Sequence, residues 1–420
     1  MSDANPQTSA PSAADQATLI LGEQQYQFPV IEGSERERAV DISFLRAETG
    51  HITLDQGYGN TGSCQSAITY IDGDQGILRY RGIPIEQFAD SPSFIEVALL
   101  LIFGKLPTQQ DYDDFSADLT RYAFLDEGMK HQFEGFPRSA PPMAILSAMI
   151  NSLSCFHPDL HELDDEEQFH HAAARLISKI RTIAAYAFRH SRGLPYIYPD
   201  PALRYVPNFL HMMLSQPYLQ YVCPHLVRKA LNLILILHAD HEQNCSTSTV
   251  RMVGSSGANV EVLSMLQQIH DGNLTPEEYV KLARDKDSKV RLMGFGHRVY
   301  KNFDPRAQML AKVAEELVPK LCRDDPLLNI ARRLEEIALS DPYFIDRQLY
   351  PNVDFYSGII LRAIGIPTNM FTVMFAIGRL PGWIAHWWEQ NQAPVSRIAR
   401  PRQIYTGNTQ TDYVPIDLRS

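Results

Sequence analysis

The chain has few cysteines, and none of them form a pair at metal-binding spacing. Its five cysteines are scattered over 420 residues without a Cys-x-x-Cys pair. We therefore expect neither a disulfide framework nor a zinc knuckle, and this usage favours the reducing cytoplasm. No Lys or Arg precedes Arg36, so we expect neither a signal peptide nor a transit peptide at the amino terminus.

Long apolar runs and positive charge are also scarce. The longest apolar runs, Val97–Phe103 and Leu233–Leu237, are far too short to cross a bilayer. Thirty-eight basic against 49 acidic residues give a net charge of −11, which argues against nucleic acid or an anionic membrane as the main partner. An anionic substrate would therefore have to be held by a local cluster of cations. The length allows one large domain and a smaller one.

Strand-like patterns are confined to the beginning of the chain. They are short β-branched or aromatic runs separated by Gly and Asp, namely Thr18–Leu21, Ile52–Leu54, Ala67–Ile71 and Ile77–Tyr80. Beyond Pro84, segments of helical length and apolar spacing follow one another, at 93–103, 108–125, 142–156, 166–189, 224–244, 305–321, 326–339, 355–364 and 371–390. Residues 1–17 have the composition of a disordered tail. The pattern predicts a mainly α protein with a small N-terminal β region.

Three blocks of sequence carry reactive side chains. The first runs from Arg291 to Arg306 and contains Gly-Phe-Gly-His, the second is Pro351-Asn-Val-Asp-Phe-Tyr-Ser-Gly358, and the third is His238-Ala-Asp-His-Glu-Gln-Asn-Cys-Ser-Thr-Ser-Thr-Val250. Together they resemble the citrate synthase family, whose members condense acetyl-CoA with oxaloacetate. The resemblance covers nearly all of residues 21–407.

The resemblance implies a two-domain, mainly α fold and an obligate dimer. The large helical domain would take residues 81–259 and 372–420, a small mobile domain residues 260–371, and the N-terminal β region residues 18–80. The β-rich beginning is similar to the bacterial class that assembles as a hexamer. The implied partners are oxaloacetate and acetyl-CoA, the latter as a co-substrate, with no tightly bound cofactor.

Condensation of a thioester methyl with a ketone needs a base and hydrogen-bond donors for two oxygens. Asp354 is the candidate base, since its neighbours Val353 and Phe355 would raise its pKa. From the residues alone, Asp354 could instead cap a helix that begins at Phe355. His297 directly follows Gly294-Phe-Gly296, whose glycines allow close approach to a ligand, and it would donate to the ketone oxygen. The alternative is a histidine in a glycine turn.

A doubly anionic keto acid also needs guanidinium groups, whose planar forks match carboxylates. The resemblance assigns that role to Arg306, Arg379 and Arg400, the last of which would reach the pocket of a partner subunit. Taken alone, each could be an exposed cation. Lys301, with Gly294, Phe295 and Gly296, would bind the coenzyme.

His238 and His241 are three positions apart on the predicted helix 224–244, so they would share a face. Such a pair can ligate zinc. However, the order His-x-x-His-Glu matches none of the usual zinc-protease helices and no third ligand stands out, so no metal is expected. The resemblance assigns His241 to oxaloacetate and leaves His238 structural.

One part of the family pattern is missing. Members run Gly-Ser-Ser-Gly-Ala-Asn, a helix, and then a loop Gly-Pro-x-His-Gly-Gly-Ala-Asn whose histidine donates to the thioester oxygen. Here Gly254–Asn259 passes directly into Val260–His270, which resembles the helix after that loop. Roughly 20 residues, about five helical turns, are absent. Since loss of one oxyanion donor typically costs about 10²–10³ in rate, we expect impaired condensation. A 2-methylcitrate synthase and a non-catalytic oxaloacetate-binding or assembly subunit remain alternatives.

Overall fold

The computed structural model describes residues 15–55, 57–89, 93–157, 165–248, 294–297, 299–300, 303–321, 326–392, 402–407, 409–410, 413 and 416. The chain forms two compact units, one of residues 66–393 and one of residues 1–65 with 394–420. Several sequence predictions lie outside the described residues: the tail up to residue 14, the junction at 259–260, Lys301 and Arg400. The proposed division at residues 260 and 371 stays a prediction.

The first unit contains a three-stranded antiparallel sheet of β1 (Gln16–Leu21), β2 (Gln24–Glu32) and β3 (Arg38–Val40). A short helix, α1 (Leu45–Thr49), follows. The predicted strand at Ile52–Leu54 is wrong, because these residues pair with no strand. A β-branched run becomes a strand only when a neighbouring edge is there to pair with it.

The second unit begins with an antiparallel meander of β4 (Thr69–Asp72), β5 (Ile77–Tyr80) and β6 (Ile83–Pro84). This agrees with the predicted strands to within two residues at each end. The fully buried Tyr80 hydroxyl lies 3.0 Å from the carbonyl oxygen of Asp240. The hairpin is thereby anchored to the turn that carries His241.

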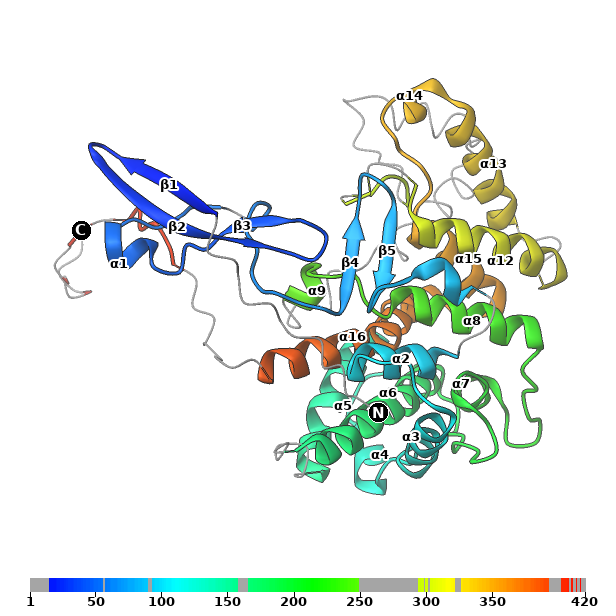
Figure 1. The fold of residues 1–420 in the computed structure, drawn as a ribbon. Coiled ribbons are helices and arrows are strands. Elements are labelled where there is room, and N and C mark those ends of the chain that lie inside the picture. The colour runs from blue at the N-terminus through cyan, green and yellow to red at the C-terminus, as the bar shows by residue number, and fades with distance from the viewer. Residues whose placement is uncertain are drawn as a thin grey trace, which may run out of the picture. The chain divides into compact units, whose positions relative to one another are not determined.

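Helices make up most of the second unit, which confirms the mainly α prediction (Figure 1). They are η1 (Ile85–Phe88), α2 (Phe94–Phe103), α3 (Gln109–Arg121), α4 (Glu127–Glu134), α5 (Pro142–Phe156), α6 (Glu166–Arg192), α7 (Tyr205–Leu214), α8 (His225–His238), α9 (Cys245–Ser248), α12 (Pro305–Leu321), α13 (Pro326–Ser340), α14 (Pro342–Ile345), α15 (Val353–Ile364), η4 (Thr368–Met370) and α16 (Phe371–Asn391). Capping boxes start α2 at Ser93 and α3 at Thr108. Helices α4 and α7, of eight and ten residues, are among the elements that the sequence pattern did not predict.

Two apolar helices organise the core. Helix α16 packs on α2, α5, α6 and α8 (Figure 1). Helix α8 buries most of its apolar side chains and also contacts α12 and α15. Each fully buried Leu or Ile contributes roughly 1.5–3 kcal/mol, so this core fixes the helices relative to one another. The end of α8, the start of α12, the start of α15 and the middle of α16 consequently carry the candidate site.

Among the helices of the described residues, no single one is long and apolar enough to cross a membrane. One bent pair, Val353–Ile364 with Thr368–Gln390 at 119°, passes that test together on length and composition alone.

Candidate active site

The glycine segment around Phe295 pairs with the residues that precede α15. Phe295 and Pro351 form an antiparallel β-bridge, and the N–H of Asn352 donates to the carbonyl oxygen of Gly294 at 2.9 Å. Gly294 and Gly296 have φ angles of 81° and 74°, a left-handed conformation that glycine adopts without a steric penalty. Two blocks that are far apart in sequence therefore lie side by side.

Asn352 begins the helix that carries Asp354. Its Oδ1 accepts from the N–H groups of Asp354 at 3.0 Å and of Phe355 at 3.3 Å, and α15 starts at Val353. The alternative in which Asp354 caps a helix beginning at Phe355 is therefore wrong. Asp354 lies half-buried in the first turn, between the buried side chains of Val353 and Phe355, the apolar surroundings that the sequence predicted.

The backbone of its own loop fixes the tautomer of His297. Its Nδ1 accepts from the N–H of Val299 at 3.1 Å and from that of Tyr300 at 3.2 Å. In a neutral ring, an accepting Nδ1 leaves the proton on Nε2. Burial, with a contribution from the Arg306 charge, lowers the pKa of His297 to about 4. At neutral pH the ring is therefore an uncharged donor through Nε2.

Arg306, in the first turn of α12, is held by Asp304. Its Nε lies 3.0 Å from Oδ1 and its Nη2 lies 2.9 Å from Oδ2. Both residues are 3% exposed, so the alternative of a solvated cation is wrong. Burial alone would lower the pKa of Arg306, but the adjacent carboxylate raises it above the ordinary value. The guanidinium is thus a fixed, permanently charged group.

His297 and Arg306 point donors toward the same place. Nη2 of Arg306 lies 3.4 Å from Nε2 of His297. Because both atoms carry protons, they do not bond to each other, but an acceptor oxygen beside them would receive both hydrogen bonds. Such a pair suits a carbonyl oxygen next to a carboxylate.

Helix α8 ends at His238, with Ala239 as its C-cap. The prediction that His238 and His241 share a helical face is therefore wrong. Tertiary contacts end the helix early: the N–H of Gly382 in α16 donates to the carbonyl oxygen of Ala239 at 3.1 Å, and the Tyr80 hydroxyl contacts the next residue. His241 consequently lies in the irregular segment that follows α8.

The ring of His241 packs edge-on against the ring of His297. Their centroids are 5.4 Å apart, and the His241 ring is 5.8 Å from the ring of Tyr300. Burial, helped by the charges of Arg306 and Arg379, lowers the pKa of His241 well below its usual value. Its Nε2 is buried and has no hydrogen-bond partner among the described residues. A ligand that satisfied this atom would relieve the desolvation penalty.

His238 has the structural role that the sequence analysis gave it. Its Nδ1 lies 2.7 Å from the carbonyl oxygen of Ile234, so Nδ1 carries the proton. Burial lowers the pKa of His238 to about 3. The ring is neutral and fixed within the core, while its own carbonyl oxygen positions Arg379.

Arg379 extends from α16 and donates through Nε to the carbonyl oxygen of His238 at 2.6 Å. It is 2% exposed, so the surface-cation alternative is wrong here too. Burial lowers the pKa of Arg379 to about 10, and the charges of Asp240, Arg306 and Asp354 also act on it. Arg379 therefore remains a cation at neutral pH and belongs to the same electrostatic cluster as the candidate base.

Three further residues of the site were not singled out from sequence. Tyr300 has a buried hydroxyl without a partner among the described residues, and burial raises its pKa. Asp304 fixes Arg306, and Asn352 connects two loops. Only the position of Asp304, two residues before an arginine, offered a signal. The other two depend on contacts between distant segments.

The structure thus gathers His241, His297, Arg306, Arg379 and Asp354 in one unit. Two neutral imidazoles, two fixed cations and one carboxylate can bind a small carbonyl-bearing dianion and remove a proton from a second reactant. Of the residues predicted to bind the coenzyme, Phe295 packs its ring against Phe355 with centroids 5.0 Å apart.

Sequence comparison identifies relatives along nearly the whole chain. The sequence model described as "Citrate synthase, C-terminal domain" matches residues 57–261 and 256–402. Citrate synthase 1 of Mycobacterium tuberculosis is 48% identical over 426 aligned positions, covering 96% of this chain and 99% of that protein.

Structural comparison leads to the same group of proteins. A crystal structure of citrate synthase from Pyrobaculum aerophilum superposes with a TM-score of 0.76 and 31% identity, over 93% of this chain and 98% of that one. The structure of Thermoplasma acidophilum citrate synthase in a ternary complex with carboxymethyl coenzyme A and oxaloacetate superposes with a TM-score of 0.76 and 28% identity, over 87% of this chain and 100% of that one.

Proposed function

The chain belongs to the citrate synthase family, and we propose that its site is built for the condensation of acetyl-CoA with oxaloacetate to citrate and coenzyme A. The observation that carries this proposal is the pair of donors, His297 Nε2 and Arg306 Nη2, 3.4 Å apart. Beside them, Nε2 of His241, which has no hydrogen-bond partner among the described residues, and the cation of Arg379 complete a receptor for a keto dicarboxylate.

In the proposed reaction, Asp354 takes a proton from the acetyl methyl group, and the resulting enol carbon attacks the ketone carbon of oxaloacetate. His297 donates to the ketone oxygen, which becomes the hydroxyl of the product. Water then cleaves the thioester and releases coenzyme A. Val353 and Phe355 flank Asp354 with buried apolar side chains, and Arg306 and Arg379 hold the two carboxylates of the keto acid.

We further propose that this chain is impaired in that reaction, because it lacks the segment with the histidine that steadies the enol. Two observations support the missing segment. The family match falls into two parts that overlap at residues 256–261, where Gly-Ala-Asn would fit either flank. The alignment to the M. tuberculosis protein has 426 positions, whereas 96% of 420 residues is about 403. About 23 positions are therefore gaps in this chain, close to the roughly 20 residues expected.

The test is a comparison of binding with turnover. Calorimetric titration with oxaloacetate should give saturable binding to this chain, while steady-state formation of coenzyme A should be slow. A second chain that carries the corresponding segment of the M. tuberculosis relative after Asn259 serves as the matched control. We expect its turnover to be at least about 10²–10³ higher, since that is the usual value of one oxyanion donor.

Each outcome separates the readings. Fast turnover of the unmodified chain would refute the impairment, and absence of oxaloacetate binding to both chains would refute the site. Higher turnover with propionyl-CoA than with acetyl-CoA in the restored chain would identify a 2-methylcitrate synthase. Oxaloacetate binding without restored turnover would favour the non-catalytic subunit.

Self-association is part of the proposal. By analogy with the family, Arg400 would reach the pocket of a partner subunit, so a complete site would need a dimer, and the N-terminal β region suggests the hexameric class. Sedimentation analysis of the full chain distinguishes a monomer from either assembly. An Arg400→Gln variant should keep the assembly and lose affinity for oxaloacetate.

A further inference from the structure

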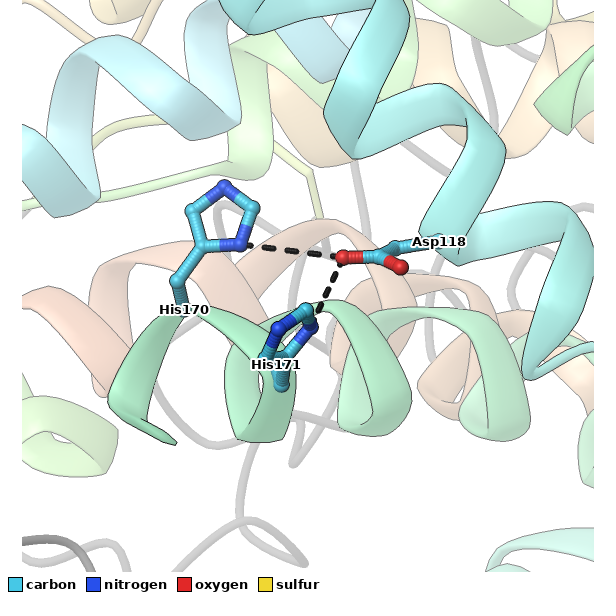
Figure 2. A group of neighbouring side chains, drawn as sticks. All are labelled: Asp118, His170 and His171. Carbon is cyan, nitrogen blue, oxygen red and sulfur yellow. Dashed lines mark hydrogen bonds and ion pairs between the residues drawn. The ribbon is translucent and has the colours of Figure 1, made fainter. Parts of the chain in front are cut away.

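A second group of histidines lies between helices α3 and α6. These helices precede the segments that carry the candidate active site in the sequence. The group consists of Asp118 on α3 and the adjacent His170 and His171 on α6. The Nδ1 atoms of both rings face the same carboxylate oxygen, Oδ2 of Asp118, at 2.9 Å for His171 and 3.8 Å for His170 (Figure 2). One donor atom from each of the three residues lies within 4.8 Å of the others.

The rings are held in place by their surroundings. The His170 ring packs against Phe103 and Phe115, with centroids 5.3 and 5.1 Å apart. The Tyr122 hydroxyl is 3.5 Å from Nδ1 of His171. These contacts reduce the rotamer freedom that a ligand would otherwise have to freeze, so the donor set is largely preorganised.

The donors are also accessible to solvent. The side chains of Asp118, His170 and His171 are 15%, 30% and 40% exposed. An ion could therefore enter from water and keep a water molecule as a further ligand. Asp111 and Asp114, on the same helix as Asp118, act electrostatically on His170 and add negative potential that attracts a cation.

We propose that Asp118, His170 and His171 form a binding site for a divalent transition-metal ion of the zinc type. Two imidazole nitrogens and one carboxylate oxygen are a donor set that Zn²⁺ accepts, with water completing a four-coordinate site. Ligand bonds of about 2.0–2.1 Å at tetrahedral angles put the donor atoms roughly 3.3 Å apart. The donors of His171 and His170 lie 2.9 and 3.8 Å from Oδ2, on either side of that value.

Metal binding replaces one contact with another. The neutral His171 ring would bind the ion through the lone pair of Nδ1 and carry its single proton on Nε2, so the ion would replace the contact between Nδ1 and Asp118. The ion would join α3 to α6, two helices that pack against each other. This role is a structural staple and is independent of the condensation site, none of whose residues belongs to these helices.

The experiment uses the full chain after removal of metal by a chelator. Zn²⁺ is titrated by calorimetry against a competing chelator, and Co²⁺ is added separately because tetrahedral nitrogen–oxygen coordination gives it visible absorption. We expect the wild-type chain to bind one zinc ion. The zinc affinity of Asp118→Asn and of His171→Gln should be at least about 100-fold lower. Loss of outer-shell partners alone typically costs 10–100-fold. Zinc should raise the melting temperature of wild type but not of these variants.

His131→Gln is the matched control, because the His131 side chain on α4 is 73% exposed and forms an ion pair with Glu134 at 3.4 Å, away from Asp118, His170 and His171. It should bind zinc as wild type does. Circular dichroism confirms that each variant is folded, and the more exposed His171→Gln remains informative if Asp118→Asn is not. Equal zinc affinity and stoichiometry in wild type and both site variants would overturn the proposal. Loss of zinc binding in His131→Gln but not in the site variants would overturn it as well.

Discussion

Asn352 donates its side-chain N–H to the carbonyl oxygen of Gly296 at 2.9 Å. The same side chain accepts from the N–H of Asp354 through Oδ1. One amide therefore joins the loop of His297 to the helix of Asp354. His297 and the candidate base Asp354 are thus held relative to each other by two hydrogen bonds of a single side chain.

We predict that Asn352→Ala and Asn352→Asp differ in stability but that both bind oxaloacetate more weakly than wild type. Alanine removes both the helix cap and the link to Gly296, which should cost about 1–3 kcal/mol of stability. Aspartate keeps the cap, since it is an equally good N-cap residue, but it cannot donate to Gly296. Urea denaturation should show that aspartate retains the cap contribution, whereas calorimetry should show weaker oxaloacetate binding in both variants. Undiminished binding by Asn352→Asp would contradict the role of the link.

The buried pair of Arg306 and Asp304 gives a second prediction. Arg306→Leu leaves a carboxylate buried without its partner, which typically costs about 3–5 kcal/mol. Adding Asp304→Asn removes that charge and keeps the acceptor for the start of α12, so the double variant should regain most of the loss. Neither variant should bind oxaloacetate with wild-type affinity. If the double variant were as unstable as Arg306→Leu alone, charge burial would not be the cause.

Stability should fall in mild acid because buried histidines stay neutral in the fold. The pKa of His238 is about 3 and that of His297 about 4, against about 6.5 in an unfolded chain. Between pH 4 and 6.5 the unfolded chain therefore binds more protons, so stability rises with pH across that window and is lost as the pH drops through it. Each such group contributes up to about 1.4 kcal/mol per pH unit.

The variant His238→Asn tests this assignment. Asparagine can still donate to the carbonyl oxygen of Ile234, but it does not titrate. Urea midpoints measured from pH 4 to pH 7 should rise less steeply than in wild type, by up to one proton's worth of slope. A slope identical to that of wild type would mean that His238 is not neutral in the folded state.

Position 73, at the tip of the β4–β5 hairpin, should not tolerate a side chain. A Cβ at Gly73 would lie 2.0 Å from the carbonyl oxygen of Val299, a residue whose N–H orients His297. Gly73→Ala should therefore destabilise the protein by about 1–3 kcal/mol and weaken oxaloacetate binding. Gly62→Ala, where nothing lies within 4 Å of the added atom, is the control and should change neither. Equal behaviour of the two variants would argue against the contact.

Long periodic segments were predictable because their pattern is local. Helix α5 and helix α12 begin and end at the predicted residues, since Pro at the first position and an apolar stripe mark them in sequence. Helix α8 was predicted too long. Nothing in residues 239–244 forbids a helix, and it is the backbone of α16 and the hydroxyl of Tyr80 that turn the chain away.

The properties of the candidate site likewise fall into those that follow from local sequence and those that follow from tertiary contacts. The sequence determined which side chains could act, because the motif blocks around His241, His297 and Asp354 carry the acids, bases and cations that a condensation needs. Only the tertiary structure decided that Asn352 rather than Asp354 caps α15, that Arg306 is paired and buried, and which nitrogen of His297 carries the proton. Those properties depend on hydrogen bonds and desolvation between segments far apart in the chain, and no local pattern records them.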